Sequence, residues 1–309
     1  MQSRSARLAL LAAAATGVQV GAAIVATRLV VADVAPLTLA MLRYAIGFLC
    51  LLPFVAGALR RQPALRAAPA VGGSVAADLL AMAALGIGQF GVLIALLNFG
   101  LQRVGAGQAA LIFSLFPLLT LLLAAALGRE TLTPALLLGV LLSLVGVALS
   151  LIPKISAVPV AAAYWWGEAA IAAAAGTGAL CSVLYRPYLQ RYPTVPVSAF
   201  AMLASVAVLA LLALSEDWPA RIGGLTGRAW SVIGFIGVSS GLGYFLWLYA
   251  LKHESPTRVT VFLSLNPVTA SLLGALVLDE AIAPWSGAAT ALIAAGLWLA
   301  TRPAPANGR

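Results

Sequence analysis

Residues 101–134 read LQRVGAGQAALIFSLFPLLTLLLAAALGRETLTP, and residues 251–284, which lie 150 positions later, read LKHESPTRVTVFLSLNPVTASLLGALVLDEAIAP. The two stretches align without a gap, and nine of their 34 positions are identical. Shared leucines carry little weight in an apolar chain, whereas a shared serine, two prolines and a glutamate in one register carry much more. These residues are Ser114/Ser264, Pro117/Pro267, Pro134/Pro284 and Glu130/Glu280. The pattern predicts an internal repeat, which decides the fold.

The repeat extends beyond this stretch. The offset of 150 also pairs Gly91/Gly241, Leu142/Leu292 and Gly146/Gly296. Near the start of each half the match is looser, because an offset of 158 pairs Arg28 with Arg186 and an offset of 160 pairs Pro36 with Pro196. We therefore predict two related halves, residues 1–152 and 164–309, joined by a linker at 153–163.

The composition indicates a membrane protein. The chain has 309 residues, of which 62% are hydrophobic and only 9% are charged, whereas soluble domains carry about 25% charged residues. Apolar runs of about 20 residues recur along the chain, which is the pattern of transmembrane helices rather than of a transmembrane barrel. The net charge of +9 does not indicate nucleic-acid binding, because lysines and arginines stand singly or in pairs between the apolar runs.

We predict an all-α protein with ten membrane spans in the lipid bilayer. The first run follows Arg4 and Arg7 and is long, so we expect an uncleaved helix rather than a signal peptide. The spans cover about 7–30, 36–58, 78–101, 106–128, 134–152, 164–187, 196–215, 229–251, 256–278 and 283–301.

The distribution of positive charge predicts the orientation. With the N-terminus in the cytoplasm, twelve lysines and arginines fall on the cytoplasmic side and five on the other side. The positive-inside rule therefore places both termini in the cytoplasm. Each half has five spans, an odd number, so the second half crosses the membrane upside down relative to the first. Inverted repeats of this kind are common in secondary transporters, whose substrate site lies near the midplane between the halves.

These features resemble a known family. Ten spans in two inverted halves, the segment PLTLAMLRY at 36–44, and the paired S-L-x-P…E-x-x-x-P motifs resemble the EamA-type members of the drug/metabolite transporter superfamily. The resemblance implies a carrier of the bacterial inner membrane, commonly an exporter of amino acids or related metabolites. The family usually has a Trp-Gly pair and a lysine in its first span, whereas this chain has QVGAAIVATR at 19–28, with Arg28 in place of the lysine.

Paired prolines provide the first candidate site residues. Pro117 and Pro267 fall near the middle of spans 4 and 9, where a proline frees the carbonyl four residues earlier. In lipid such a carbonyl must face protein, water or substrate. We expect two kinks that flank a central cavity, one from each half, although packing kinks are the alternative.

Polar residues lie beside these prolines. Ser114, Ser264 and Asn266 are candidates for substrate binding, and Asn266 stands opposite Phe116 in the repeat, so the site is expected to be asymmetric. Asn266 could bind a carboxylate or an amine of the substrate. The alternative is a hydrogen bond between helices, worth about 1 kcal/mol.

Spans 3 and 8 are expected to face the same cavity. Span 3 offers Gln89 and Asn98, and span 8 offers Tyr244 and Trp247. A cavity lined by aromatic faces suits an apolar, aromatic or cationic substrate. Packing in the core or against lipid is the alternative for both aromatic residues.

Arg43 is the charge that lies clearly inside a span, about 12 Å from the outer end at about 1.5 Å per residue. An intramembrane arginine is costly and indicates a functional site. Its candidate partners are the freed carbonyls, a substrate carboxylate, or Glu168 near the outer end of span 6. A structural arginine that reaches toward the interface is the alternative.

The acidic residues lie at span ends or in loops, which argues against proton exchange by a carboxylate at the midplane. Glu130 is predicted to cap a helix, and Asp279 and Glu280 could form an outer gate with Arg28 or Arg103. Cys50 and Cys181 read as small apolar residues, and His253 lies in a loop. We therefore expect no metal, no cofactor, no P-loop and no enzyme activity.

The sequence thus predicts a carrier, monomeric and acting on a small organic solute, most simply an amino acid or related metabolite. A pore for small solutes is the alternative, and a membrane enzyme is a more distant one.

Overall fold

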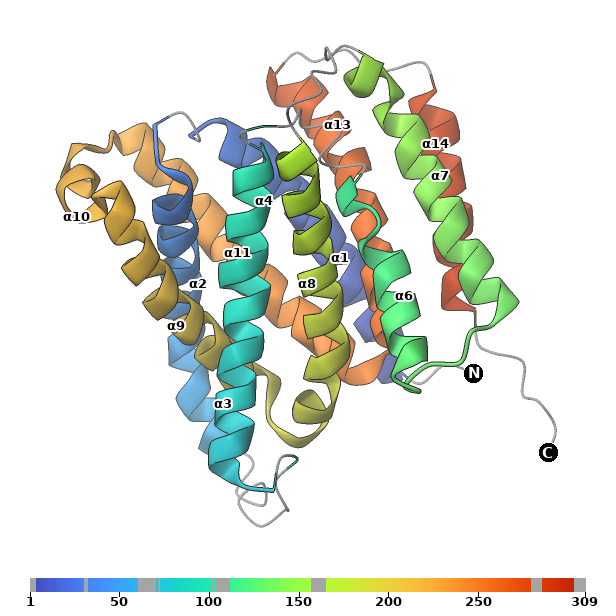
Figure 1. The fold of residues 1–309 in the computed structure, drawn as a ribbon, viewed down its shortest axis with the longest axis horizontal. Coiled ribbons are helices and arrows are strands. Elements are labelled where there is room, and N and C mark those ends of the chain that lie inside the picture. Colours follow the sequence, from blue (N-terminus) through green and yellow to red (C-terminus); the bar gives the residue numbers. More distant parts are fainter. Residues whose placement is uncertain are drawn as a thin grey trace.

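The computed structural model describes residues 4–30, 33–60, 71, 73–101, 103, 112–156, 165–278 and 285–302. All regular secondary structure in these residues is helical, and the helices form one bundle (Figure 1). The first half contains α1 (Arg4–Arg28), α2 (Pro36–Arg60), α3 (Val75–Gly86), the π-helix η2 (Ile87–Val92), α4 (Leu93–Leu101), α6 (Phe116–Ala126) and α7 (Pro134–Ser156).

The second half begins with the two long helices α8 (Trp165–Arg191) and α9 (Thr194–Leu212). Short helical turns follow, and the half then ends with three further helical regions. These elements are η3 (Ala213–Glu216), α10 (Trp218–Arg221), η4 (Ile222–Gly224), α11 (Gly227–His253), α12 (Pro256–Thr260), η5 (Val261–Ser264), α13 (Leu265–Leu278) and α14 (Ser286–Thr301).

A helical segment falls within each of the ten predicted spans, over the residues that the structure describes. Six helices are long and apolar enough to cross a membrane, while 116–126, 134–149 and 287–301 are shorter apolar helices. The six are Ser5–Thr27, Pro36–Val55, Val75–Gly100, Trp165–Arg191, Thr194–Glu216 and Gly227–His253. The chain is therefore an all-helical, multi-pass membrane protein. The number of ten crossings and their orientation remain predictions.

The two halves make equivalent helix contacts, so that a contact between two helices recurs between their counterparts in the other half. Helix α1 packs against α11 and α13, and its counterpart α8 packs against α4 and α6. Likewise α2 packs against α11, and its counterpart α9 packs against α3. The pairs α2–α9 and α7–α14 join equivalent helices. In Figure 1, α6 lies in the lower part of the bundle and its counterpart α13 in the upper part.

We call the end where α1 begins and α14 ends the termini end, which is the lower end in Figure 1. Hydrogen bonds tie other element ends to it, because Arg258 Nη2 donates to the carbonyl of Arg302 at 2.6 Å and Thr257 N donates to Glu130 Oε1 at 3.1 Å. The opposite end, where α1 ends and α2, α8 and α11 begin, we call the far end.

Glycines allow the closest helix crossings. A Cβ added to Gly241 of α11 would lie 2.8 Å from the carbonyl oxygen of Gly47 on α2. A Cβ on Gly296 of α14 would lie 2.6 Å from the carbonyl oxygen of Gly139 on α7. Both distances are shorter than any ordinary contact, so only glycine permits these two pairs of backbones to approach so closely.

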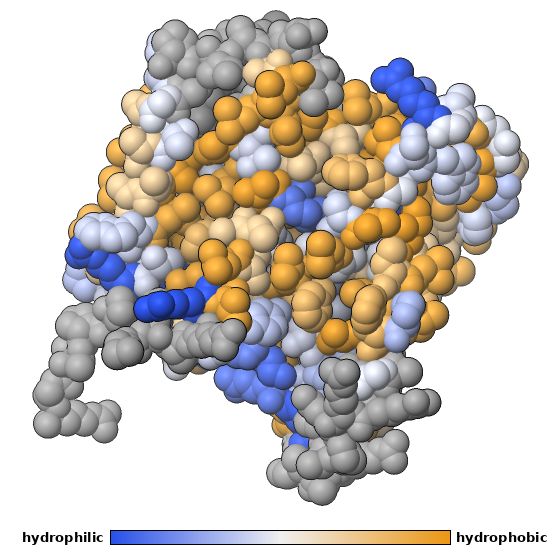
Figure 2. Space-filling view, turned by 180° about the vertical axis from the view of Figure 1, so that it is seen from behind, coloured by the Kyte–Doolittle hydropathy of each residue, from blue (hydrophilic) through white to orange (hydrophobic). Residues whose placement is uncertain are grey.

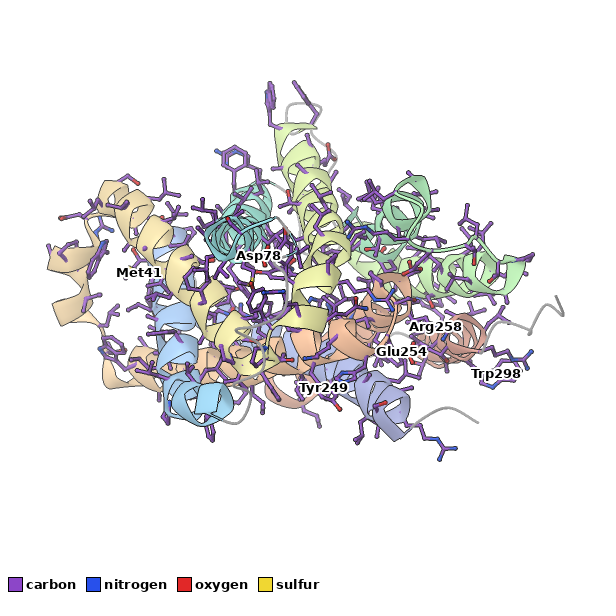
Figure 3. All side chains as sticks on the ribbon, turned by 90° about the horizontal axis from the view of Figure 1, so that it is seen from below. Met41, Asp78, Tyr249, Glu254, Arg258 and Trp298 are labelled. Atoms are coloured by element: carbon purple, nitrogen blue, oxygen red, sulfur yellow. The ribbon has the colours of Figure 1, made fainter. Side chains whose placement is uncertain are left out.

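The outer surface is apolar, as a lipid-facing surface requires. Leu80, Leu211 and Leu276 are 72%, 69% and 79% exposed, and apolar side chains cover most of the face in Figure 2. Exposed tryptophans lie near the far end, at the starts of α8, α11 and α14, and Trp298 lies near the end of α14, at the edge of the bundle in Figure 3. Those near the far end are Trp165, Trp166, Trp230 and Trp285. Tryptophans at both ends are typical of membrane interfaces.

Candidate functional site

A cavity of about 260 Å³ lies between the two halves. Its wall comes from α1, α2, η2, α4, the break before α6 with the first turn of α6, α7, α11, η5 and α13. Nine of the ten residues predicted from the sequence line this cavity, four from the first half and five from the second. They are Arg43, Gln89, Ser114, Pro117, Tyr244, Trp247, Ser264, Asn266 and Pro267. Their role in binding remains a proposal, but the structure brings them together.

Asn98 is the predicted residue that lies elsewhere. It is not among the residues that line the cavity. Its Nδ2 donates a hydrogen bond to the carbonyl of Pro36 at 3.2 Å. Asn98 therefore fastens α4 to the first residue of α2. At the same place the Glu216 carboxylate accepts hydrogen bonds from Leu37 N (2.9 Å), Thr38 N (2.8 Å) and Thr38 Oγ1 (2.8 Å), so it caps α2 from the neighbouring helix.

The two prolines that the repeats share, Pro117 and Pro267, each lie where a new helix begins after an interruption of the span. Residues 114–115 form a turn, α6 begins at Phe116, and Pro117 lies in its first turn. In the second half η5 ends at Ser264, α13 begins at Leu265, and Pro267 lies in its first turn. A first turn tolerates proline because its backbone N–H groups have no helical partner. Each span is thus interrupted beside the cavity, where we predicted a kink within a continuous helix.

A π-helix at Ile87–Val92 carries Gln89 and Phe90 into the cavity. Such segments often occur at functional sites, because one wide turn re-aims the side chains around it. The corresponding part of the second half lies within the continuous α-helix α11. The π-helix is therefore a feature of the first half that the repeat did not predict. It adds to the asymmetry already seen at Phe116 and Asn266.

Arg43 brings a positive charge to the cavity wall. Its Nε donates to Ser240 Oγ at 2.5 Å, and its guanidinium carbon lies 5.5 Å from the centroid of the Tyr44 ring. It forms no ion pair with any described residue, Glu168 included. An arginine at this depth without a carboxylate partner leaves guanidinium donors available to a ligand.

Aromatic rings form one wall of the cavity. The Phe90 ring lies 4.0 Å from the Tyr244 ring and 4.6 Å from the Tyr44 ring, between centroids. The Phe116 ring lies 6.3 Å from Trp247, nearly at right angles to it. These tilted and edge-to-face rings present large apolar surface to anything held in the cavity. Phe90 and Phe116 had no distinguishing signal in the sequence, because a phenylalanine in an apolar span can equally face lipid.

Two amide groups supply hydrogen-bond acceptors. Gln89 Oε1 and Asn266 Oδ1 are buried and have no hydrogen-bond partner among the described residues. Buried polar atoms are nearly always paired in folded proteins. Acceptors left open at the wall of a cavity are therefore suited to a ligand that donates hydrogen bonds.

Two polar residues of α1 also line the cavity and were not predicted. Gln19 Nε2 donates to Ser239 Oγ at 3.2 Å, and Thr16 Oγ1 donates to the carbonyl of Gly243 at 3.1 Å. Both contacts join α1 to α11. A glutamine in an otherwise apolar span was the available signal for Gln19.

The predicted cap at Glu130 takes a specific form. Its Oε1 accepts the backbone N–H of Thr257, so it caps the start of α12 in the other half. Asp279 and Glu280, predicted as an outer gate, lie outside the described residues. Arg103 donates to the carbonyl of Phe99 at 2.9 Å, and its guanidinium lies over the Phe99 ring.

A multi-pass helical bundle with a cavity lined by both halves is the architecture of a membrane transporter. The model of the EamA-like transporter family matches residues 7–152 and 165–302. The chain therefore belongs to the EamA-like transporter family, and it is a membrane transporter.

Named relatives and a solved structure agree with this assignment. The aromatic amino acid exporter YddG of Ancylobacter novellus is 32% identical over 208 residues, covering 65% of this chain and 69% of its own. A probable terminal-alkyne amino-acid exporter of Streptantibioticus cattleyicolor is 30% identical over 212 residues, covering 67% and 68%. One crystal structure is similar with a TM-score of 0.77 at 26% identity and covers 97% of both chains.

Proposed function

We propose that the protein is a secondary carrier that exports an amino acid, or a closely related metabolite, across the bacterial inner membrane. In this proposal the two inverted halves expose the cavity to each side in turn, and the protein works as a monomer. The names of two relatives, an aromatic amino acid exporter and a probable terminal-alkyne amino-acid exporter, support the substrate class. The family and its relatives favour transport over enzymatic chemistry.

The observation that carries the proposal is the chemistry of the cavity wall. Arg43 offers a positive charge that no described carboxylate neutralises, and Gln89 and Asn266 offer unpaired acceptors. An amino acid is a zwitterion with complementary groups. Its carboxylate would bind Arg43, and its ammonium group would donate to the amide oxygens. The aromatic wall at Phe90 and Tyr244 would hold an apolar or aromatic side chain.

The size of the cavity is consistent with a single amino acid. Its volume of about 260 Å³ is just below the range of about 300–1,000 Å³ that is usual for drug-sized ligands. A much larger solute would need the walls to move apart. The proposed substrate class is therefore a small zwitterion with an apolar side chain.

We place the termini end of the bundle in the cytoplasm. Positive residues gather there, among them Arg129, Arg191, Lys252, Arg258 and Arg302. The exposed tryptophans at the starts of α8, α11 and α14 would then lie at the periplasmic interface.

Counterflow with purified protein tests the proposal. Proteoliposomes preloaded with unlabelled L-phenylalanine should take up labelled L-phenylalanine faster than empty ones, because a carrier exchanges substrate on each cycle. A thermal-shift screen of the amino acids identifies the preferred one, since a ligand that binds the folded state raises the apparent stability. A pore would show no acceleration by preloading. The proposal is wrong if no amino acid shifts the melting temperature and none exchanges, while the Asn98→Ala control and the parent protein are both folded.

A further inference from the structure

A buried ion pair holds α3 and α8 together at the termini end. Arg191 Nε lies 3.5 Å from Asp78 Oδ2, and the two side chains are 8% and 0% exposed. The Tyr192 hydroxyl donates to the same oxygen at 2.6 Å, and Val71 N donates to it at 3.0 Å. Burial, together with this bond to Asp78, raises the pKa of Tyr192, so its hydroxyl remains a donor.

Further contacts extend this closure across the termini end. The Tyr185 hydroxyl, two turns earlier on α8, donates to the carbonyl of Met82 at 3.3 Å. Lys252, at the end of α11, donates from Nζ to the carbonyl of Tyr192 at 3.3 Å. Helix α8 also packs against α11. Figure 3 looks at the bundle from this end, with Asp78 near its centre. The termini end is therefore closed below the cavity.

A groove lies at the corresponding place of the far end. The counterparts of α8 and α3 are α1 and α11, which pack against each other. At the far end a groove of about 360 Å³ is lined by residues 22–29, by residues 231–235 of α11 and by Leu273 of α13. Val25 lines both this groove and the central cavity. Over their described residues α1 and α4 do not pack together, although their counterparts α8 and α11 do. The cavity therefore lies toward the far end in this structure.

The repeat places a second pair of charges at the far end. The offset of 158 that pairs Arg28 with Arg186 also pairs Asp33 with Arg191, and the offset of 150 pairs Arg228 with Asp78. Because a π-helix accommodates an extra residue, the pairing of Arg228 with Asp78 holds to within about one residue. The acid and the base have thus exchanged halves. Asp33 and Arg228 are exposed, and neither forms an ion pair with a described residue.

We propose that these two pairs gate the cavity in turn: Asp78 and Arg191 close the termini end in this conformation, and Asp33 and Arg228 close the far end in the other. The proposal rests on the proposed alternating-access function. When α1 and α11 adopt the packing that α8 and α3 have now, Asp33 meets Arg228. The reverse movement parts Asp78 from Arg191. Packed interfaces of this kind switch between two arrangements rather than deform continuously.

Charge reversal with rescue tests the pair at the far end, Asp33 and Arg228. Asp33→Arg and Arg228→Asp should each slow amino-acid counterflow about tenfold, and the double variant should return it to within about twofold of the parent. A structural role for either residue alone would not be rescued by the second change. Arg221→Asp is the matched control, because Arg221 is exposed near the same end and has no counterpart in the ion pair.

A second readout follows the conformation without any substrate. Val20→Cys, in a chain with Cys50→Ala and Cys181→Ala, places one thiol in the cavity wall. A membrane-impermeant thiol reagent added from the far side should label it faster in each single reversal and at the parent rate in the double reversal. Equal labelling in all variants, or single reversals without rescue, overturns the gate. If the cysteine is labelled as expected in all variants but no amino acid exchanges, the substrate proposal fails and the gate proposal stands.

Discussion

Replacing Arg43 tests directly how the cavity recognises a substrate. Arg43→Gln removes the charge but keeps a polar side chain that can reach Ser240. Leaving a buried carboxylate without its charged partner costs about 2–5 kcal/mol. Arg43 is only partly buried, so we expect the lower end, about 2 kcal/mol, which corresponds to about a 30-fold weaker Kd. Arg43→Lys keeps the charge but loses the forked geometry, so its effect should be intermediate.

A pair of ligands separates recognition from folding. L-phenylalanine and phenethylamine differ in the carboxylate, so binding of both by calorimetry to the parent and to Arg43→Gln forms a double-mutant cycle. The parent should prefer the amino acid by about 30-fold, and Arg43→Gln should bind both ligands about equally. Asn98→Ala, outside the cavity, should keep the preference of the parent. The reasoning is refuted if Arg43→Gln weakens both ligands by the same factor, because Arg43 would then act on the fold rather than on the carboxylate.

Two further predictions concern stability in detergent, measured by unfolding of the purified protein. Gly241→Ala should destabilise the protein by about 1–3 kcal/mol, because its Cβ would meet the Gly47 backbone. Gly234→Ala on the same helix is the control, since its Cβ meets nothing within 4 Å, and it should be neutral or slightly stabilising. Equal effects of the two changes would show that the crossing of α2 and α11 is not tight. Glu216→Gln should lower the free energy of unfolding by about 1–2 kcal/mol, because it weakens the cap of α2. Asp217→Asn next to it is the control and should be neutral, since Asp217 is exposed and has a φ of 53°, which asparagine tolerates. A loss of stability from both changes would point to the loop rather than to the cap.

The repeat made the helical architecture and the composition of the cavity predictable. Shared prolines and serines in an apolar background mark equivalent positions, and equivalent positions of two halves meet near the axis that relates them. Pro117, Pro267, Ser114 and Ser264 line one cavity for this reason. Arg43 was predicted as a site residue because a charge inside the membrane is costly, and Arg43 also lines the cavity.

Other features depend on contacts that a single span does not reveal. The π-helix at Ile87–Val92 follows the same apolar pattern as an α-helix, so the sequence does not reveal it. Asn98 does not line the cavity and instead donates a hydrogen bond to the first residue of α2, a contact between two spans. Asp78 belongs to the acidic residues that the sequence places at span ends. Its burial depends on Arg191 and Tyr192, which only the packing of α8 on α3 brings to it.

The interrupted symmetry of the cavity has a consequence for how a solute would travel. A cavity with true twofold symmetry would accept a zwitterion in two orientations of equal energy, head to tail and reversed. The π-helix with Gln89, and Asn266 where the other half has Phe116, remove that degeneracy. One orientation is then favoured throughout the cycle, and the same group of the solute leads at entry and trails at exit. The protein would thus handle its cargo as a polar object, with a front and a back.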